Sequence, residues 1–227
     1  MAGATGLGSY RGRVTSRAGL LTAWANAWLA GAVGTSEVTE AVTGGTGGTS
    51  RLRGRVQDAL LAWRKSGNPV KVVLPVPGDV RGLPGPAPFR TAALDAGEAV
   101  VGGELGLVPI HADHWRAYDI EPVPDDFVQL SEAQHALTEA IRETASILAQ
   151  ADFLRPTSDV GAELGAARRI GETLELPRGF PAPAVALVAQ AERMQAVLDL
   201  APPDLPELRG LATAVRRALT AGYNTAT

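Results

Sequence analysis

The spacing of apolar residues changes twice along this chain of 227 residues, and this change constrains its fold more than any other feature. Up to about residue 66, apolar residues recur at helical intervals of three and four. Residues 70–121 instead contain short β-branched runs separated by Pro and Gly, and helical spacing returns over residues 130–222. The order of these regions predicts a helix-rich α+β fold.

The first region, residues 16–66, is predicted to fold into three helices. They span about residues 16–32, 35–42 and 50–66. Ser16 has the side chain and position of an N-cap for the first helix. Trp24 and Trp28 lie on one stripe of that helix, and we expect this stripe to cover the strands that follow. Residues 1–15, which are rich in Gly, are expected to be flexible.

The middle region, residues 70–121, is predicted to form a small antiparallel β-meander. The expected strands are residues 70–76, 89–94, 98–101, 105–111 and 115–121. A Pro-rich loop over residues 75–88 interrupts the meander, because Pro is excluded from helix interiors and central strands.

The last region, residues 130–222, is predicted to form a bundle of about four antiparallel helices joined by short loops. They lie near residues 131–151, 159–174, 183–198 and 206–221. With the N-terminal helices covering the meander, residues 1–227 are expected to make a single composite domain. The alternative is a domain boundary near residue 80, within the Pro-rich loop.

Composition narrows the possible chemistry. The chain has no cysteine, which excludes disulfides, thiolate nucleophiles and Cys-ligated metals, and we expect a cytoplasmic protein. The apolar run at residues 18–34 is interrupted by polar residues and is too short for a membrane span, so no span is expected. Residues 1–72 carry a net charge of +6 and the remainder −9, a polarity that suits either an acidic partner or internal attraction.

Arginine almost replaces lysine in this chain, since Lys65 and Lys71 are its only lysines. Any catalytic amine would therefore have to be one of these two side chains. The abundance of Ala, Gly, Pro and Arg is typical of GC-rich bacterial genomes. The run AALDAGEAVVGGELGLVPIH, residues 92–111, resembles a segment of uncharacterised proteins from such bacteria, and the resemblance implies no activity.

One cluster has the residue types of a metal site. His111, Asp113 and His114 supply two imidazoles and a carboxylate, which bind zinc or non-haem iron when a coordination position stays open. The alternative is a polar turn between two paired strands, with the two histidines pointing in different directions. The turn is the simpler interpretation, and no cofactor is predicted.

Two further segments have the composition of interaction sites. Arg51 and Arg55 share one helix face, and Arg64 extends the basic region, although the acidic chain as a whole argues against nucleic-acid binding. The segment PGPAP is either a polyproline II ligand for a partner or a stiff spacer. Its prolines are Pro84, Pro86 and Pro88.

No hydrolase or metalloprotease motif is present: GxSxG, HExxH and SxxK are all missing from the sequence. The leading hypothesis is therefore a non-enzymatic interaction or scaffold protein with a protein partner or a homo-oligomeric state. The second is a small-molecule-binding protein or enzyme with its site at the β-meander. The third is nucleic-acid binding through the basic N-terminal part.

Overall fold

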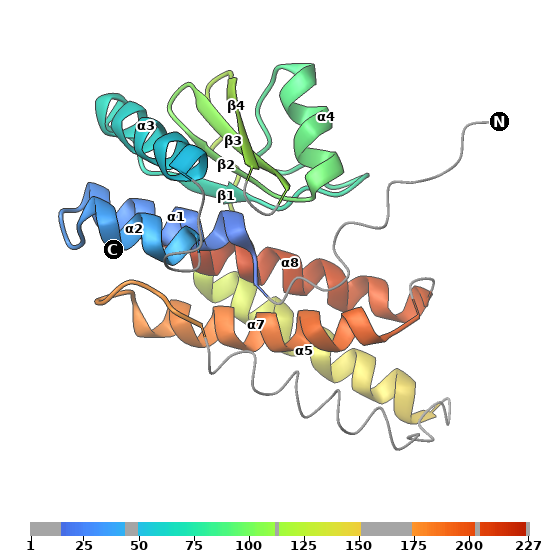
Figure 1. Cartoon of the computed structure of the whole chain (residues 1–227). Helices are drawn as coiled ribbons and strands as arrows, with labels where there is room; N and C mark the ends of the chain where they lie inside the picture. The colour runs from blue at the N-terminus through green and yellow to red at the C-terminus, as the bar shows by residue number, and fades with distance from the viewer. Residues whose placement is uncertain (1–14, 44–49, 112–113, 151–173, 203–204, 226–227) are drawn as a thin grey trace. The chain divides into compact units, whose positions relative to one another are not determined.

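The computed structural model describes residues 15–43, 50–111, 114–150, 174–202 and 205–225. The chain divides into two compact units: Met1–Phe127 with Glu175–Phe180 and Tyr223–Thr227, and Val128–Leu174 with Pro181–Gly222. All described strands belong to the first unit, and both units contain helices (Figure 1). The predicted helix-rich α+β class is confirmed. The expectation of one composite domain stays a prediction.

The first unit is an antiparallel sheet with helices on both faces. Its helices are α1 (Arg17–Leu29), α2 (Thr35–Thr43), α3 (Ser50–Ser66) and α4 (Ala87–Ala96), and its strands are β1 (Lys71–Val73), β2 (Ala99–Gly102), β3 (Leu105–His111) and β4 (His114–Asp119). The strand order is β1-β2-β3-β4 and every pair is antiparallel, which confirms the predicted meander. Figure 1 shows α3 and α4 on opposite sides of this sheet.

The sequence prediction is wrong for residues 89–94, which belong to α4 and not to a strand. Phe89, Ala93 and Ala96 are buried, and their spacing of four and three places them on one helix face. The helix ends at Gly97, which adopts a left-handed conformation with φ of 70°. The short run was mistaken for a strand because its apolar residues alone do not distinguish the two structures.

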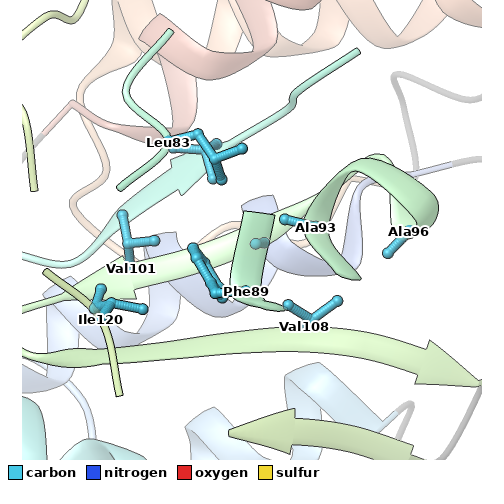
Figure 2. Close-up of a cluster of buried hydrophobic side chains, with 9 residues drawn as sticks. Leu83, Phe89, Ala93, Ala96, Val101, Val108 and Ile120 are labelled. Atoms are coloured by element: carbon cyan, nitrogen blue, oxygen red, sulfur yellow. The ribbon is translucent and has the colours of Figure 1, made fainter. Parts of the chain in front are cut away.

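The side chains of α4 complete a core on one face of the sheet (Figure 2). Phe89 lies directly above β3, because Gly106 has no side chain there: a Cβ at Gly106 would lie 2.6 Å from the Phe89 ring. The core consists of buried apolar residues from α4, the strands and their flanking loops. They are Val73, Leu83, Phe89, Ala93, Ala96, Ala99, Val101, Val108 and Ile120.

The start of α1 is fixed by two side chains. Ser16 is the N-cap that the sequence predicts, and its Oγ accepts a hydrogen bond from the Gly19 N–H at 3.0 Å. Glu98, which is fully buried before β2, accepts from the Ser16 hydroxyl at 2.8 Å and from the Ala18 N–H at 3.1 Å. A carboxylate at a helix N-terminus is favoured by the unpaired N–H groups and the helix dipole. Glu98 therefore ties α1 to the sheet.

The two tryptophans of α1 were expected to cover the sheet. Their indole N–H groups donate hydrogen bonds to residues outside it. The Trp28 indole N–H donates to the Thr35 hydroxyl at 2.9 Å, and the Arg64 guanidinium lies 3.6 Å from the centre of the Trp28 ring. The Trp24 N–H donates to the Glu175 carbonyl at 3.1 Å. These contacts join α1 to α2, to α3 and to the segment Glu175–Phe180.

The outer edge of β1 is closed by two asparagine side chains. Asn26 of α1 accepts from the Val70 N–H and donates to the Val70 carbonyl, both at 2.8 Å. Asn224 does the same to Val72, at 2.6 and 3.0 Å. Each amide thus pairs with the strand as a neighbouring backbone would.

The second unit is helical. Its described helices are α5 (Leu130–Gln150), α7 (Ala182–Leu200) and α8 (Arg209–Tyr223), with a short 3-10 turn, η1 (Pro206–Leu208), before α8. Three of the four predicted helices are therefore confirmed, and the one expected over residues 159–174 falls almost entirely outside the described residues. The buried side of α7 repeats at helical spacing. It includes Ala184, Leu187, Val188 and Ala191.

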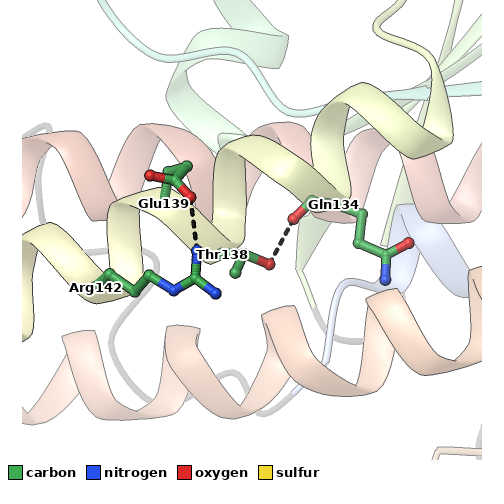
Figure 3. Close-up of polar contacts among 4 residues, drawn as sticks. All are labelled: Gln134, Thr138, Glu139 and Arg142. Atoms are coloured by element: carbon green, nitrogen blue, oxygen red, sulfur yellow. Dashed lines mark hydrogen bonds and ion pairs between the residues drawn. The ribbon is translucent and has the colours of Figure 1, made fainter.

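Figure 3 shows two polar contacts on the exposed side of α5. Thr138 donates to the Gln134 carbonyl at 2.9 Å, and Arg142 pairs with Glu139 at 2.8 Å. Both charged side chains are more than half exposed, so solvent screening leaves the pair worth about 0.5 kcal/mol or less. The position of α5 depends instead on its buried face.

Candidate functional site

A pocket of about 910 Å³ lies at one end of the sheet in the first unit. It is bounded by the C-terminal end of α3, the start of β1, the β2–β3 turn and the segment that follows β4. Both lysines of the chain, Lys65 and Lys71, line it. We call it the lysine pocket.

Two glycines bring the β2–β3 turn against α3. A Cβ at Gly102 would lie 2.9 Å from the Trp63 ring, and a Cβ at Gly103 would lie 2.5 Å from Ser66. Gly103 also has a φ of +54°, which side chains rarely adopt. The Trp63 indole N–H donates to the Leu105 carbonyl at 3.2 Å and fixes the helix on the turn. The wall of the lysine pocket therefore depends on these two glycines, because a side chain at either position would collide with α3.

Charges of both signs surround the lysine pocket. Lys65 and Lys71 face a lining that also contains three carboxylates, Glu104, Asp119 and Asp125. Of these five side chains only Lys71 is half-buried, and the other four are exposed.

One lysine is held in place by an aromatic ring. The Lys71 ammonium lies 5.0 Å from the centre of the Phe127 ring, within the range of a cation–π interaction. Lys65 lies in the last turn of α3, where a cation is favoured by the carbonyl groups at the helix end. The two ammonium groups thus reach the lysine pocket from the helix and from the sheet.

The predicted metal cluster is only partly within the described structure. His111 and His114 are partners across the end of the β3–β4 hairpin, where the strand register is irregular between Pro109 and His111. Asp113 lies outside the described residues. Within the described ranges, no group of three or more His, Asp or Glu side chains is arranged to hold a metal ion. The metal site stays a prediction.

The predicted basic residues lie on α3 with different surroundings. Arg64 stacks on Trp28, as described above, and this contact gives it a packing role. Arg55 is exposed on the helix. Arg51 belongs to the same helix, but its side chain lies outside what the structure describes.

The predicted Pro-rich ligand does not run as one exposed extended segment. Pro84 is buried, and Pro86 is the extended N-cap residue of α4. Pro88 is exposed in the first turn of α4, a position that suits proline because the missing N–H has no helical partner there. The interaction role of these three residues stays a prediction.

The lysine pocket could not be predicted from the sequence. Lys65 and Lys71 stood out there only as the sole lysines of the chain, and that rarity was the one signal that pointed to them. Asp119 was noticed only as a carboxylate soon after His111, Asp113 and His114, and Asp125, next to Asp126, was interpreted as a capping or solvated carboxylate. Their convergence depends on the course of the segment after β4, which local spacing does not reveal.

Two family models match consecutive parts of the chain, and both describe the same family. Residues 18–129 match the model of the Rv1486c-like protein, N-terminal domain, and residues 131–220 match that of the Rv1486c-like protein, C-terminal domain. The chain belongs to the Rv1486c-like proteins. The lysine pocket lies entirely within the part matched by the N-terminal model.

Related mycobacterial proteins cover most of this Rv1486c-like chain. The uncharacterized protein Rv1486c of Mycobacterium tuberculosis (strain ATCC 25618 / H37Rv) is 29% identical over 233 residues, covering 78% of this chain and 80% of that protein. The uncharacterized protein ML1804 of Mycobacterium leprae (strain TN) is 27% identical over 244 residues, covering 79% and 82%. No solved structure matches significantly.

In the part of the chain that the structure describes, none of the helices has the length and apolar character to cross a bilayer.

Proposed function

We propose that this Rv1486c-like protein is a non-enzymatic binding protein and that its lysine pocket holds a small ligand carrying both negative and positive groups. The observation that carries the proposal is that the only two lysines of the chain, which are far outnumbered by arginine, line the same pocket. The proposal keeps the hypothesis of a small-molecule site at the β-meander. It places that site at the end of the strands opposite to the histidines.

The charges of the lysine pocket support a ligand of mixed charge. Anionic groups of the ligand would pair with Lys65 and Lys71, and cationic groups with Glu104, Asp119 or Asp125. A ligand with only one sign of charge would leave part of this lining facing a like charge, which is unfavourable. The apolar surface of Phe127 would contact the body of the ligand.

The exposure of the pocket favours binding over catalysis. Four of its five charged side chains are exposed to solvent. Enzymes usually exclude water around the groups that carry out chemistry, because a low dielectric strengthens the interactions that stabilise the transition state. An open pocket of this kind suits reversible binding.

The two lysines make occupancy of the pocket directly measurable. The full chain is treated with a limiting amount of an amine-acetylating reagent, and acetylation at Lys65 and Lys71 is measured by peptide mass spectrometry. The reaction of the chain's α-amino group serves as the internal reference. The probes are a lysyl-glutamate dipeptide, succinate, putrescine and glucose. We expect the dipeptide to protect both lysines most strongly.

Matched variants test whether the lysines bind the ligand. Lys65→Gln and Lys71→Gln are each expected to weaken dipeptide binding about threefold to tenfold, the effect of one partly exposed ion pair. Arg55→Gln removes a cation from the same helix outside the pocket and should leave the affinity unchanged. If no probe protects either lysine, or if both lysine variants bind as the original chain does, the proposal is wrong.

The interaction or scaffold role is a second candidate, and one specific observation supports it. The outer edge of β4 has no backbone partner among the described residues, whereas the edge of β1 is closed by Asn26 and Asn224. The β4 edge is buried at Trp115 and exposed at Asp119, so its C-terminal end is the part on which another chain can bind by strand addition.

A further inference from the structure

One turn of the Pro-rich loop lies against the segment that borders the lysine pocket. Gly82 is the third residue of this turn, in which the Leu83 N–H donates to the Val80 carbonyl at 3.0 Å. Its φ of +71° is a conformation that favours glycine at this place in a turn. Leu83 is buried in the core between α4 and the sheet, so the turn is anchored beside Gly82.

The Phe127 ring packs on Gly82. A Cβ at Gly82 would lie 2.8 Å from this ring, so the ring occupies the space that a side chain would need. Beside it, the Asp126 carboxylate lies 3.7 Å from the Arg81 guanidinium. Phe127 also packs against the core between α4 and the sheet, and it lines the lysine pocket. The Pro-rich loop therefore helps to fix where the ring stands in the pocket.

The strand register places this ring on the side of Lys71. Lys71 pairs with Val101, which belongs to the core between α4 and the sheet, so both residues lie on that face of the sheet. The Lys71 ammonium lies 5.0 Å from the centre of the Phe127 ring. Lys65 instead belongs to α3, on the other side of the sheet (Figure 1). The two lysines thus reach the pocket from opposite faces of the sheet, and the ring stands beside one of them.

We propose that Phe127, held in place by Gly82, is a positioning residue that orders Lys71 for an anionic group of the ligand. This role rests on the proposed function, because it concerns how the lysine pocket binds. Lysine has a long flexible side chain, and fixing it during binding costs conformational entropy. A cation–π contact that fixes the ammonium beforehand reduces this cost. An exposed contact of this kind changes an equilibrium constant by a factor of about two to five.

The contact with the ring leaves the Lys71 ammonium able to bind an anion. An ammonium has several N–H donors, and the face of one ring covers only one side of it. Lys71 itself lines the pocket, so an anion can approach from the open side while the contact with Phe127 persists. If the ring instead competed with the ligand for the ammonium, removing the ring would raise the affinity.

Two glycine variants of the same loop test the role of the ring. Gly82→Ala adds a Cβ that displaces the Phe127 ring, whereas the Cβ of Gly78→Ala meets nothing within 4 Å. Both glycines are the third residue of a turn and have positive φ, +71° and +89°, so the backbone strain is comparable. Acetylation of Lys71 relative to Lys65 is measured in the full chain without ligand, by peptide mass spectrometry.

Displacing the ring exposes the Lys71 ammonium to the reagent. We therefore expect the acetylation ratio to rise about twofold to fivefold in Gly82→Ala and to stay unchanged in Gly78→Ala. An equal change in the two variants would overturn the positioning role, because backbone strain would then be its cause.

Variants at Phe127 keep the role testable if Gly82→Ala fails to fold. Phe127→Leu keeps an apolar side chain but removes the ring, so the acetylation ratio should rise about twofold to fivefold. Binding of the lysyl-glutamate dipeptide should weaken by the same factor, measured from the protection of Lys65 at increasing dipeptide concentration. Phe127→Tyr keeps an aromatic ring and should retain the original ratio and affinity.

The results distinguish the positioning role from the proposed function. If the dipeptide protects the original chain but Phe127→Leu leaves either the ratio or the affinity unchanged, the positioning role is overturned and the proposed function stands. A higher affinity in Phe127→Leu also overturns the role, because the ring would then compete with the ligand. If no probe protects either lysine of the original chain, both proposals are overturned.

Discussion

Single residues decide how the sheet of the first unit ends. Asn26 and Asn224 each supply an amide that pairs with the backbone of Val70 or Val72. A strand edge closed in this way has no free backbone groups for another chain at those positions. These contacts could not be predicted from local sequence, because an asparagine signals a turn locally and its partner lies 44 or 152 residues away.

Replacing Asn224 by alanine should destabilise the first unit by about 2–4 kcal/mol, because it leaves the buried N–H and C=O of Val72 unpaired. The free energy of unfolding in urea measures the loss, and amide exchange at Val72 should become much faster. Asn68→Ala, at an exposed asparagine, is the control and should change stability by less than about 0.5 kcal/mol. Unchanged exchange at Val72 in Asn224→Ala would show that this pairing does not protect the edge.

Other residue-scale features could be predicted. Ser16 was identified as a helix cap from its side chain and position alone, and the structure confirms it. Lys65 and Lys71 were noticed for their rarity, but their meeting in one pocket depends on where α3 ends and on the path of the chain after β4. Local chemistry is thus readable from the sequence, whereas contacts between distant segments are not.

At the scale of elements, most helices and strands follow from periodicity, and α4 shows where periodicity is insufficient. Most of its ten residues are apolar, but the segment is too short to repeat a pattern over several turns, and an apolar run of that length fits either structure. Longer segments such as α5 and α7 repeat their apolar positions over several turns and were predicted correctly. The decisive feature of α4 is its end, where Gly97 takes a left-handed conformation suited to a helix terminus.

Two glycine-to-alanine substitutions in helical segments should therefore have opposite effects. Gly97→Ala forces a side chain into φ of 70° and should destabilise the protein by about 1 kcal/mol. Gly54→Ala lies within α3, where an added Cβ meets nothing within 4 Å, and should stabilise the protein by about 0.5–1 kcal/mol. Chemical denaturation of the two variants measures both changes. A destabilising Gly54→Ala would contradict the helical geometry of α3 at that position.

At the scale of the whole molecule, the two units are not two consecutive stretches of chain. The first unit includes Glu175–Phe180 and Tyr223–Thr227, which follow most of the second unit in sequence. Tyr223 is fully buried, and it packs so closely on α1 that a Cβ at Gly19 would lie 2.5 Å from its ring. The family models divide the sequence near residue 130, yet the first unit is completed by residues from the C-terminus.

Truncation after Gly222 should consequently weaken the first unit, although the removed residues come at the opposite end of the sequence. It deletes the Tyr223 ring, which leaves a cavity beside α1, and the Asn224 amide, which opens the edge of β1. Hydrogen exchange measured by mass spectrometry should show faster exchange in α1 and β1 and little change in α7.

A truncation after Thr225 is the matched control, because it keeps both side chains and should exchange like the full chain. The result in α7 also distinguishes two descriptions of the molecule. If α7 loses protection together with α1 and β1, the units unfold cooperatively, as the single composite domain predicted from the sequence requires. If only the first unit is affected, the two units unfold independently. The C-terminal residues then belong to the first unit, although they come last in the sequence.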